Sequence, residues 1–131
     1  MENTEEKKTE EKKYNYESAF EQVKYEVDRM LSTSPLIIRS YTKHLGASMG
    51  KFIRAASVIT CAMDNEGQIG EKAVKLAAAV EIMHLATLVH DDVIDNADLR
   101  RGELTLQKKY GERTAVICGD YLICIAMKLA A

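Results

Sequence analysis

An all-α fold, with helices packed around a central cavity, is predicted by three properties of this 131-residue sequence. Hydrophobic residues make up 47% of the chain, which is enough for a packed core in one domain. A single proline and seven glycines leave long stretches free to form helices. Apolar residues recur at helical spacing, and no segment has the pattern of a convincing strand. We therefore expect a helical bundle.

The N-terminal part divides into a tail and two helices. Residues 1–13 are rich in Glu, Lys and Thr and lack apolar anchors, so we expect a disordered charged tail, followed by a helical domain over residues 14–131. Apolar residues on one face predict an amphipathic helix over Asn15–Leu31. A Ser-Pro step then suits the start of a short helix over Leu36–Leu45.

Glycine-containing breaks separate the remaining predicted elements. The longest helix should run from Gly70 or Glu71 to Asn96, with small and apolar residues suited to close packing in its first part. The other elements are a helix over Lys51–Met63, a loop around Leu99–Gly102, a short helix ending near Tyr110, and a last helix over Arg113–Leu129.

Composition excludes several classes of protein. With a net charge of −2, the chain has no overall basic character that would indicate nucleic-acid binding. Three cysteines without CxxC spacing indicate buried thiols in a reducing compartment rather than disulfides or a zinc site. The polar start is no signal peptide, and the longest apolar stretch, Ala115–Ala131, is interrupted by charges. We therefore expect a cytoplasmic protein with no transmembrane segment.

Three carboxylates lie within five residues at the end of the longest predicted helix. Asp91 and Asp95 are one turn apart on one face, and Asp92 lies beside them. Acids this close repel unless a cation lies between them, and hard oxygen ligands suit Mg²⁺. The alternative is a solvated acidic helix end, but the apolar residues before Asp91 disfavour it.

Positively charged residues suggest what such a metal would hold. Arg100 and Arg101 follow the acids closely, and Arg beside Mg²⁺ is a common way to bind phosphate. Lys51 and Arg54 are three residues apart on one predicted helical face, although alone such a pair is usually solvated. His84 lies two turns before the acids and looks toward the same cavity, unless it is an ordinary core histidine. The pattern predicts a metal-assisted diphosphate site.

Five ordered motifs together resemble the trans-isoprenyl diphosphate synthases, or polyprenyl synthetases. Their first aspartate-rich motif is similar to Asp91–Asp95, and the segments around it to Glu81–His90 and Ala97–Gly102. Their Gly-Gly-Lys-Arg-Leu-Arg-Pro segment resembles Gly50–Arg54, with Met, Phe and Ala in place of the first Gly, the Arg and the Pro. Their Gly-Asp-Tyr segment resembles Gly119–Tyr121.

The resemblance implies a prenyl transfer reaction and a role for each matching residue. Asp91, Asp92 and Asp95 would hold Mg²⁺ on the allylic diphosphate as the catalytic carboxylates, and Arg100 would bind the same diphosphate. Four residues would bind isopentenyl diphosphate: Lys51, Arg54, His84 and Arg101. The family's helical fold, its dimers, and the pairing of some long-chain members with an unlike subunit are also implied. A long prenyl product would bring peripheral contact with a membrane.

Product length and completeness also follow from the resemblance. Short-chain members block the tail's path with aromatics four or five residues before the first Asp, where this chain has Thr87 and Ala86; Val80 lies further along the path. We therefore expect a medium- or long-chain product, as made by a heptaprenyl diphosphate synthase large subunit. A second aspartate-rich motif and a Lys-Thr segment are absent from these 131 residues, so we expect one wall of an active site.

Three other functions fit part of the pattern. A non-catalytic subunit would bind diphosphate or a partner without the second metal cluster. A metal phosphohydrolase using His84, His90 and Asp91 would leave the dense acidic cluster and the Arg-Arg-Gly unexplained. A terpene cyclase would not need Lys51, Arg54 and Arg101 for a second diphosphate.

Overall fold

The computed structural model describes residues 10–47 and 50–131, and it confirms the predicted all-α class. The predicted disorder of residues 1–9 lies outside this part of the chain. Six helices form the described molecule: α1 (Tyr16–Ser32), α2 (Leu36–Ala47), α3 (Ile53–Cys61), α4 (Glu71–Ile94), α5 (Leu106–Tyr110) and α6 (Glu112–Ala130). Each lies within a few residues of a predicted helix.

Four two-residue strands were not predicted, and they form two antiparallel pairs. They are β1 (Lys13–Tyr14) with β2 (Ile69–Gly70), and β3 (Leu99–Arg100) with β4 (Glu103–Leu104). The first pair attaches the end of the predicted tail to the start of α4. There a Glu11 carboxylate oxygen also accepts the Lys72 backbone N–H at 3.2 Å. Runs of two residues are too short for a period-two pattern to reveal them.

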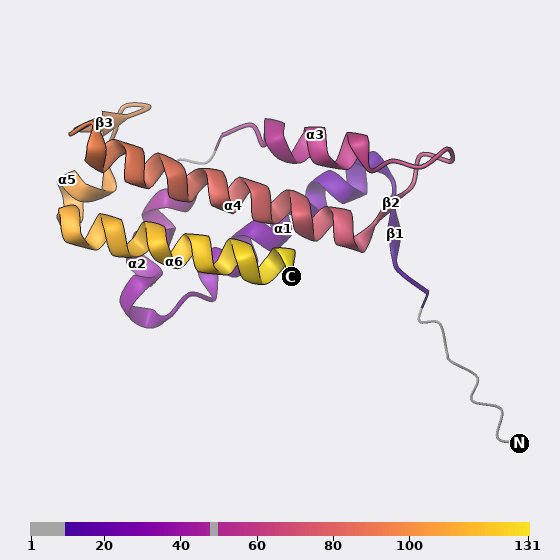
Figure 1. Cartoon of the computed structure of the whole chain (residues 1–131), viewed down its shortest axis with the longest axis horizontal. Helices are drawn as coiled ribbons and strands as arrows, with labels where there is room; N and C mark the ends of the chain where they lie inside the picture. Colours follow the sequence, from indigo (N-terminus) through magenta and orange to yellow (C-terminus); the bar gives the residue numbers. More distant parts are fainter. Residues whose placement is uncertain (1–9, 48–49) are drawn as a thin grey trace, which may run out of the picture.

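α4 is the central helix, and α1, α3 and α6 pack along it (Figure 1). Its buried residues lie on several sides, among them Ala77, Ala78 and Ala79, whose small side chains allow close packing. α1 contributes a single stripe at every fourth position: Ala19, Val23, Val27 and Leu31. Among the described helices α4 alone has the length and composition of a membrane span, but half of its apolar window is buried inside the protein.

α4 ends at Ile94, two residues before the predicted boundary, and side chains of the following segment bind the backbone on both sides of this end. Gln107 donates to the carbonyl oxygens of Asp92 and Ala97, both at 2.7 Å. Thr105 donates to the Ala97 carbonyl at 2.7 Å. Asn96 has a φ of 51°, a left-handed conformation that ends the helix.

Candidate diphosphate site

A tight hairpin presents the two adjacent arginines. Arg101 and Gly102 occupy the turn between β3 and β4 with φ values of 49° and 82°. Positive φ at both central residues is typical of a type I′ turn, which glycine adopts readily. The predicted loop around Leu99–Gly102 is therefore an ordered hairpin, with Arg100 at the end of a strand and Arg101 at the tip.

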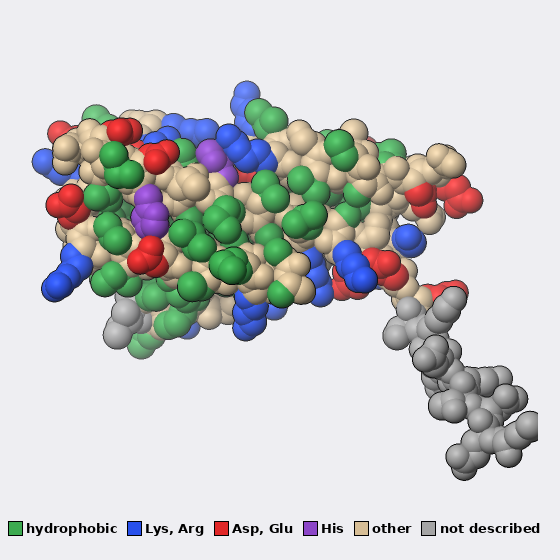
Figure 2. All heavy atoms as spheres, in the orientation of Figure 1, with side chains coloured by type: hydrophobic (Ala, Val, Ile, Leu, Met, Phe, Trp, Pro, Cys, Tyr) green, Lys and Arg blue, Asp and Glu red, His purple; other side chains and the backbone are tan. Residues whose placement is uncertain are grey.

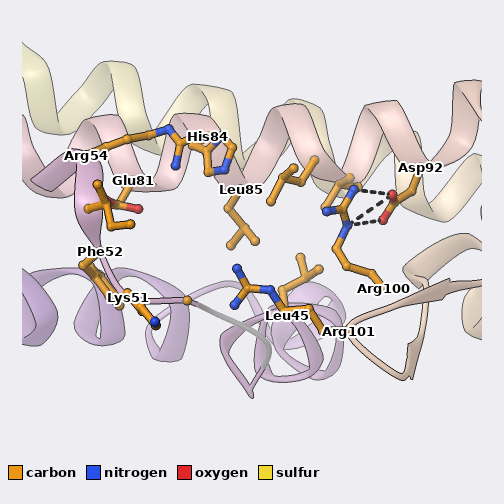
Figure 3. A pocket seen from close by; sticks show the side chains of 14 residues that line it. Leu45, Lys51, Phe52, Arg54, Glu81, His84, Leu85, Asp92, Arg100 and Arg101 are labelled. Atoms are coloured by element: carbon orange, nitrogen blue, oxygen red, sulfur yellow. Dashed lines mark hydrogen bonds and ion pairs between the residues drawn. The ribbon is translucent and has the colours of Figure 1, made fainter.

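Arg100 is paired with one of the predicted metal ligands. Its Nη2 lies 2.6 Å from Asp92 Oδ1, and its Nε lies 2.9 Å from Asp92 Oδ2 (Figure 3). Asp92 is buried, which strengthens a two-pronged ion pair of this kind. The hydrogen bond to Asp92 raises the pKa of Arg100 above its ordinary value. In this structure Asp92 therefore orients Arg100.

The start of α3 differs from the prediction and reveals a residue for which the sequence suggested no role. The helix begins at Ile53, after Phe52 in a left-handed conformation with a φ of 56°, so Lys51 precedes the helix. Phe52 offers no side-chain cap. Instead, the Ala55 backbone N–H donates to Glu81 Oε1 of α4 at 2.8 Å. Glu81 is buried, and the signal available in the sequence was an acidic residue within the apolar run of the longest predicted helix.

A pocket of about 260 Å³ lies between α4, the segment leading into α3, and the hairpin (Figure 3). Every residue predicted to contact diphosphate lines it: Lys51, Arg54, His84, Arg100 and Arg101. Glu81, Asp92 and the apolar Leu45, Leu85, Leu88 and Val89 complete much of the lining. Three segments far apart in the sequence thus place five nitrogen-bearing side chains around one cavity.

Gly50 brings two of these segments into direct contact. A Cβ atom added at Gly50 would lie 2.7 Å from both terminal nitrogens of Arg101. The guanidinium group of Arg101 therefore occupies the space that any other residue at position 50 would fill. This contact joins the segment before α3 to the hairpin.

The pocket is electropositive around His84. Burial lowers the pKa of the His84 imidazole, and the charges of Arg54, Arg100 and Arg101 lower it further, while Glu81 opposes them. Figure 3 shows the Arg54 side chain reaching toward His84. Cations crowded so closely favour a multiply charged anion between them.

The three aspartates at the end of α4 differ in their exposure to solvent. Asp91 and Asp95 are exposed at the end of α4, where the Asp95 N–H donates to the Asp91 carbonyl at 2.8 Å, and neither lines the pocket. Asp92 lines the pocket and is committed to Arg100. In the described part of the chain no three metal-ligating side chains are gathered together. The exposed, oxygen-only pair of Asp91 and Asp95 fits Mg²⁺, which keeps part of its shell for water and phosphate.

The predicted chain-length residues lie on different faces of α4. Thr87 is exposed and donates to the His84 carbonyl at 2.7 Å, and Val80 is half-buried. Ala86 is fully buried in the core, away from the exposed face that carries Thr87 and Asp91. Leu76 extends this exposed face toward the start of α4.

His90, which adjoins the aspartates, faces α6 instead of the pocket. Its Nε2 lies 3.1 Å from the Val116 carbonyl oxygen and 3.3 Å from Asp120 Oδ1. A Cβ atom on Gly119 would collide with the His90 ring. Gly119 and Asp120 of the Gly-Asp-Tyr segment thus contact His90 where α6 packs on the end of α4.

The described helices thus place a cationic pocket beside carboxylates at the end of α4. The family model that describes "Polyprenyl synthetase" matches residues 35–131. The chain is 40% identical over 100 residues to geranylgeranyl diphosphate synthase of Saccharolobus solfataricus, covering 76% of this chain and 30% of that protein. It is 37% identical to heptaprenyl diphosphate synthase component 2 of Geobacillus stearothermophilus, covering 83% of this chain and 34% of that protein.

A solved structure agrees with these sequence relatives. Heptaprenyl diphosphate synthase of Staphylococcus aureus superposes with a TM-score of 0.80 at 33% identity, covering 89% of this chain and 37% of that chain. This chain belongs to the polyprenyl synthetase family. It spans about a third of the length of the curated relatives it matches.

Proposed function

We propose that this chain forms the diphosphate-binding wall of a trans-polyprenyl diphosphate synthase. The observation that carries the proposal is the convergence of Lys51, Arg54, His84 and Arg101 on one pocket, with Arg100 at its edge beside Asp92. The enzyme condenses isopentenyl diphosphate with an allylic diphosphate to give a medium- or long-chain all-trans product. The names of the relatives, a geranylgeranyl and a heptaprenyl diphosphate synthase, support this substrate class.

Different residues of the pocket bind the two diphosphates. Lys51, Arg54, His84 and Arg101 bind isopentenyl diphosphate, and Arg100 binds the diphosphate of the allylic partner next to Asp91 and Asp95. Asp91 and Asp95 would hold Mg²⁺, which would supply positive charge to neutralise the departing pyrophosphate. Arg100 is already oriented by Asp92, so little reorganisation is needed when the anion arrives.

The condensation breaks one C–O bond and forms one C–C bond. The C–O bond of the allylic diphosphate breaks, and its electron pair leaves with pyrophosphate to give an allylic carbocation. The double bond of isopentenyl diphosphate supplies the pair for the new C–C bond, and a proton is then lost. The chain's own residues contribute positive charge near the leaving group and an apolar floor, made by Leu85, Leu88 and Val89, that excludes water.

We further propose that the exposed face of α4 carries the growing prenyl tail. Thr87, Val80 and Leu76 follow one another along this face below Asp91, and none of them is aromatic. A tail could therefore extend past Thr87 along α4 without meeting an aromatic side chain. This supports a product of medium or long chain length, which would bring peripheral contact with a membrane.

The proposed enzyme acts in the cytoplasm as a homodimer or with an unlike subunit. Val116, Ile117 and Met127 of α6 are 39%, 57% and 62% exposed, and apolar side chains cover much of the face formed by α4 and α6 (Figure 2). Faces of this kind mark contacts with further protein. The word "component" in the name of the Geobacillus relative supports an unlike subunit.

A second candidate is a non-catalytic subunit that binds diphosphate or a partner. The cations that line the pocket come from this chain, and Asp92 is paired with Arg100 at 2.6 Å. This combination suits anion binding without turnover.

Calorimetry with inorganic pyrophosphate and Mg²⁺ tests the shared part of both candidates. The chain is expected to bind one pyrophosphate, and Arg54→Gln should weaken binding at least about tenfold, as for loss of a charge-assisted hydrogen bond. Lys24→Gln, which removes an exposed cation of α1 outside the pocket, is the control. Equal affinity of Arg54→Gln and the unchanged chain would overturn diphosphate binding in this pocket, which both candidates share.

A further inference from the structure

Glu81 stands out among the pocket residues because it is the wrong charge for binding an anion. It is 5% exposed, it lines the same cavity as Arg54 and His84, and a second carboxylate there works against a diphosphate. In the described part of the chain it forms no ion pair within 4.0 Å. Its Oε1 accepts the Ala55 backbone N–H at 2.8 Å. A buried carboxyl group that opposes the ligand calls for another role.

The start of α3 lacks a side-chain N-cap of its own, and Glu81 supplies the missing hydrogen-bond acceptor. The residue in the N-cap position, Phe52, has no side-chain acceptor and adopts a left-handed conformation with φ 56° and ψ 37°. The free N–H groups and partial positive charge of a helix start are stabilised by a carboxylate. Ala55 is fully buried, so its N–H would lack a water partner if Glu81 were absent.

The hydrogen bond is a feature of this chain rather than of the motif it resembles. Ala55 stands where the Gly-Gly-Lys-Arg-Leu-Arg-Pro pattern has proline, and proline has no backbone N–H to donate. The link joins the first turn of α3 to α4 three residues before His84. It therefore ties the helical turn that carries Arg54 to the helix that carries His84 (Figure 3).

We infer that Glu81 is a positioning residue for the isopentenyl diphosphate subsite: by accepting the Ala55 N–H, it holds the start of α3 so that Arg54 lies beside His84 and Lys51 lines the same pocket. This inference rests on the proposed function. Glu81 acts through the backbone and does not touch the diphosphate. Its hydrogen bond, not its negative charge, is what supports anion binding.

Substitutions at position 81 separate the hydrogen bond from the charge, with pyrophosphate affinity measured by calorimetry on the full chain. Glu81→Gln keeps an acceptor oxygen and removes the charge, so affinity is retained or rises. Glu81→Ala removes both and lowers affinity at least about tenfold. Glu81→Asp keeps the charge but withdraws the oxygen by one methylene, so it also loses affinity. It serves as the test if Glu81→Ala does not fold. Glu71→Ala, on the same helix but outside the pocket, should bind like the unchanged chain.

A double-mutant cycle with Ala55→Pro tests the route through the backbone. Proline in the first helical turn is tolerated but removes the donor. In that background Glu81→Ala should change affinity by less than about threefold. An equal loss in both backgrounds, or a Glu81→Gln variant as weak as Glu81→Ala, overturns the inference while leaving the proposed function intact. Failure of the unchanged chain to bind pyrophosphate overturns the proposed function and this inference with it.

Discussion

At the residue scale, the pocket is organised around His84, whose pKa is lowered by burial and by three nearby arginines. A bound diphosphate would reverse part of this effect, because its negative charge stabilises the imidazolium form. The same linkage makes anion binding take up a proton. Anion affinity should therefore fall as the pH rises through the pKa of His84.

This behaviour predicts the outcome of an NMR titration of the histidine ring signals. The pKa of His84 should rise when saturating pyrophosphate and Mg²⁺ are added. His44, whose ring nitrogen lies 2.9 Å from the Leu104 carbonyl oxygen outside the pocket, provides the reference signal. A His84 titration curve that is unchanged by pyrophosphate would contradict the placement of the anion beside it.

Substitution of Gly50 should lower pyrophosphate affinity because of its contact with Arg101. In Gly50→Ala the new methyl group would displace the guanidinium of Arg101, which is exposed and flexible, so stability should change little. Pyrophosphate affinity should fall about threefold, in line with the loss of one partly solvated ion contact. Calorimetry on Gly50→Ala and on the Gly50→Ala/Arg101→Gln pair checks this. If Gly50→Ala lowers pyrophosphate affinity equally in the Arg101→Gln background, displacement of Arg101 is not the cause of the loss.

At the element scale, the helices were predictable but the details that build the site were less so. Apolar periodicity and Gly and Pro breaks placed all six helices within a few residues, since burial of a stripe determines where a helix packs. The convergence of Lys51, Arg54, His84, Arg100 and Arg101 was also expected, though from motif resemblance. The prediction that Lys51 and Arg54 share a helical face was wrong, because α3 starts after Lys51.

Tertiary contacts account for the features that were missed. The Asp92–Arg100 pair depends on a hairpin of two-residue strands, which leaves no periodic signal in the sequence. The role of Glu81 depends on a left-handed Phe52 that leaves α3 without its own cap. Neither apolar periodicity nor composition reports on side-chain contacts that depend on the geometry of a turn or on how two helices pack.

The packing of α6 on α4 predicts the effect of Gly119→Ala. A methyl group here would collide with the His90 ring, so overpacking should outweigh the roughly 1 kcal/mol gained in helix propensity. We expect the free energy of unfolding to fall by about 1–2 kcal/mol, measured by urea titration. Replacing His90 with Ala in the same chain should restore much of this loss. A stabilising effect of Gly119→Ala would contradict the close packing of His90 against α6.

The exposed face of α4 predicts how product length responds to substitution. In a chain extended at its C-terminus by the rest of the family fold, Thr87→Phe should shorten the product, because an aromatic ring would block the tail below Asp91. Chromatography of the dephosphorylated products measures this. Ala86→Phe is a less informative change, because Ala86 is fully buried and the variant should lose stability. Products of unchanged length from Thr87→Phe would overturn the proposed path.

At the scale of the whole molecule, the described helices leave a broad apolar face uncovered. Leu76 and Ile94 of α4 are 47% and 74% exposed, and Val116, Ile117 and Met127 of α6 add to the same kind of surface. Burying this surface against further protein would be favourable by about 25 cal/mol per Å² of apolar area. The 131-residue chain should therefore dimerise or aggregate on its own.

Analytical ultracentrifugation over a range of concentrations checks this expectation. The sedimentation coefficient should rise with concentration, and Ile117→Glu should shift the chain toward the monomer. Glu112→Gln, a change at an exposed residue of the same helix, is the control. A compact monomer that unfolds cooperatively in two states would contradict the expected self-association.

The central claim, that this chain supplies the diphosphate-binding wall of a prenyl synthase, is tested most directly by a Mg²⁺-dependent condensation assay. Isopentenyl and farnesyl diphosphates are supplied to the 131-residue chain and to the C-terminally extended chain. We expect turnover by the extended chain, its loss in Arg54→Gln and Asp91→Asn variants of that chain, and none by the 131 residues alone. Turnover by the short chain, or an extended chain indifferent to Arg54 and Asp91, would contradict the claim.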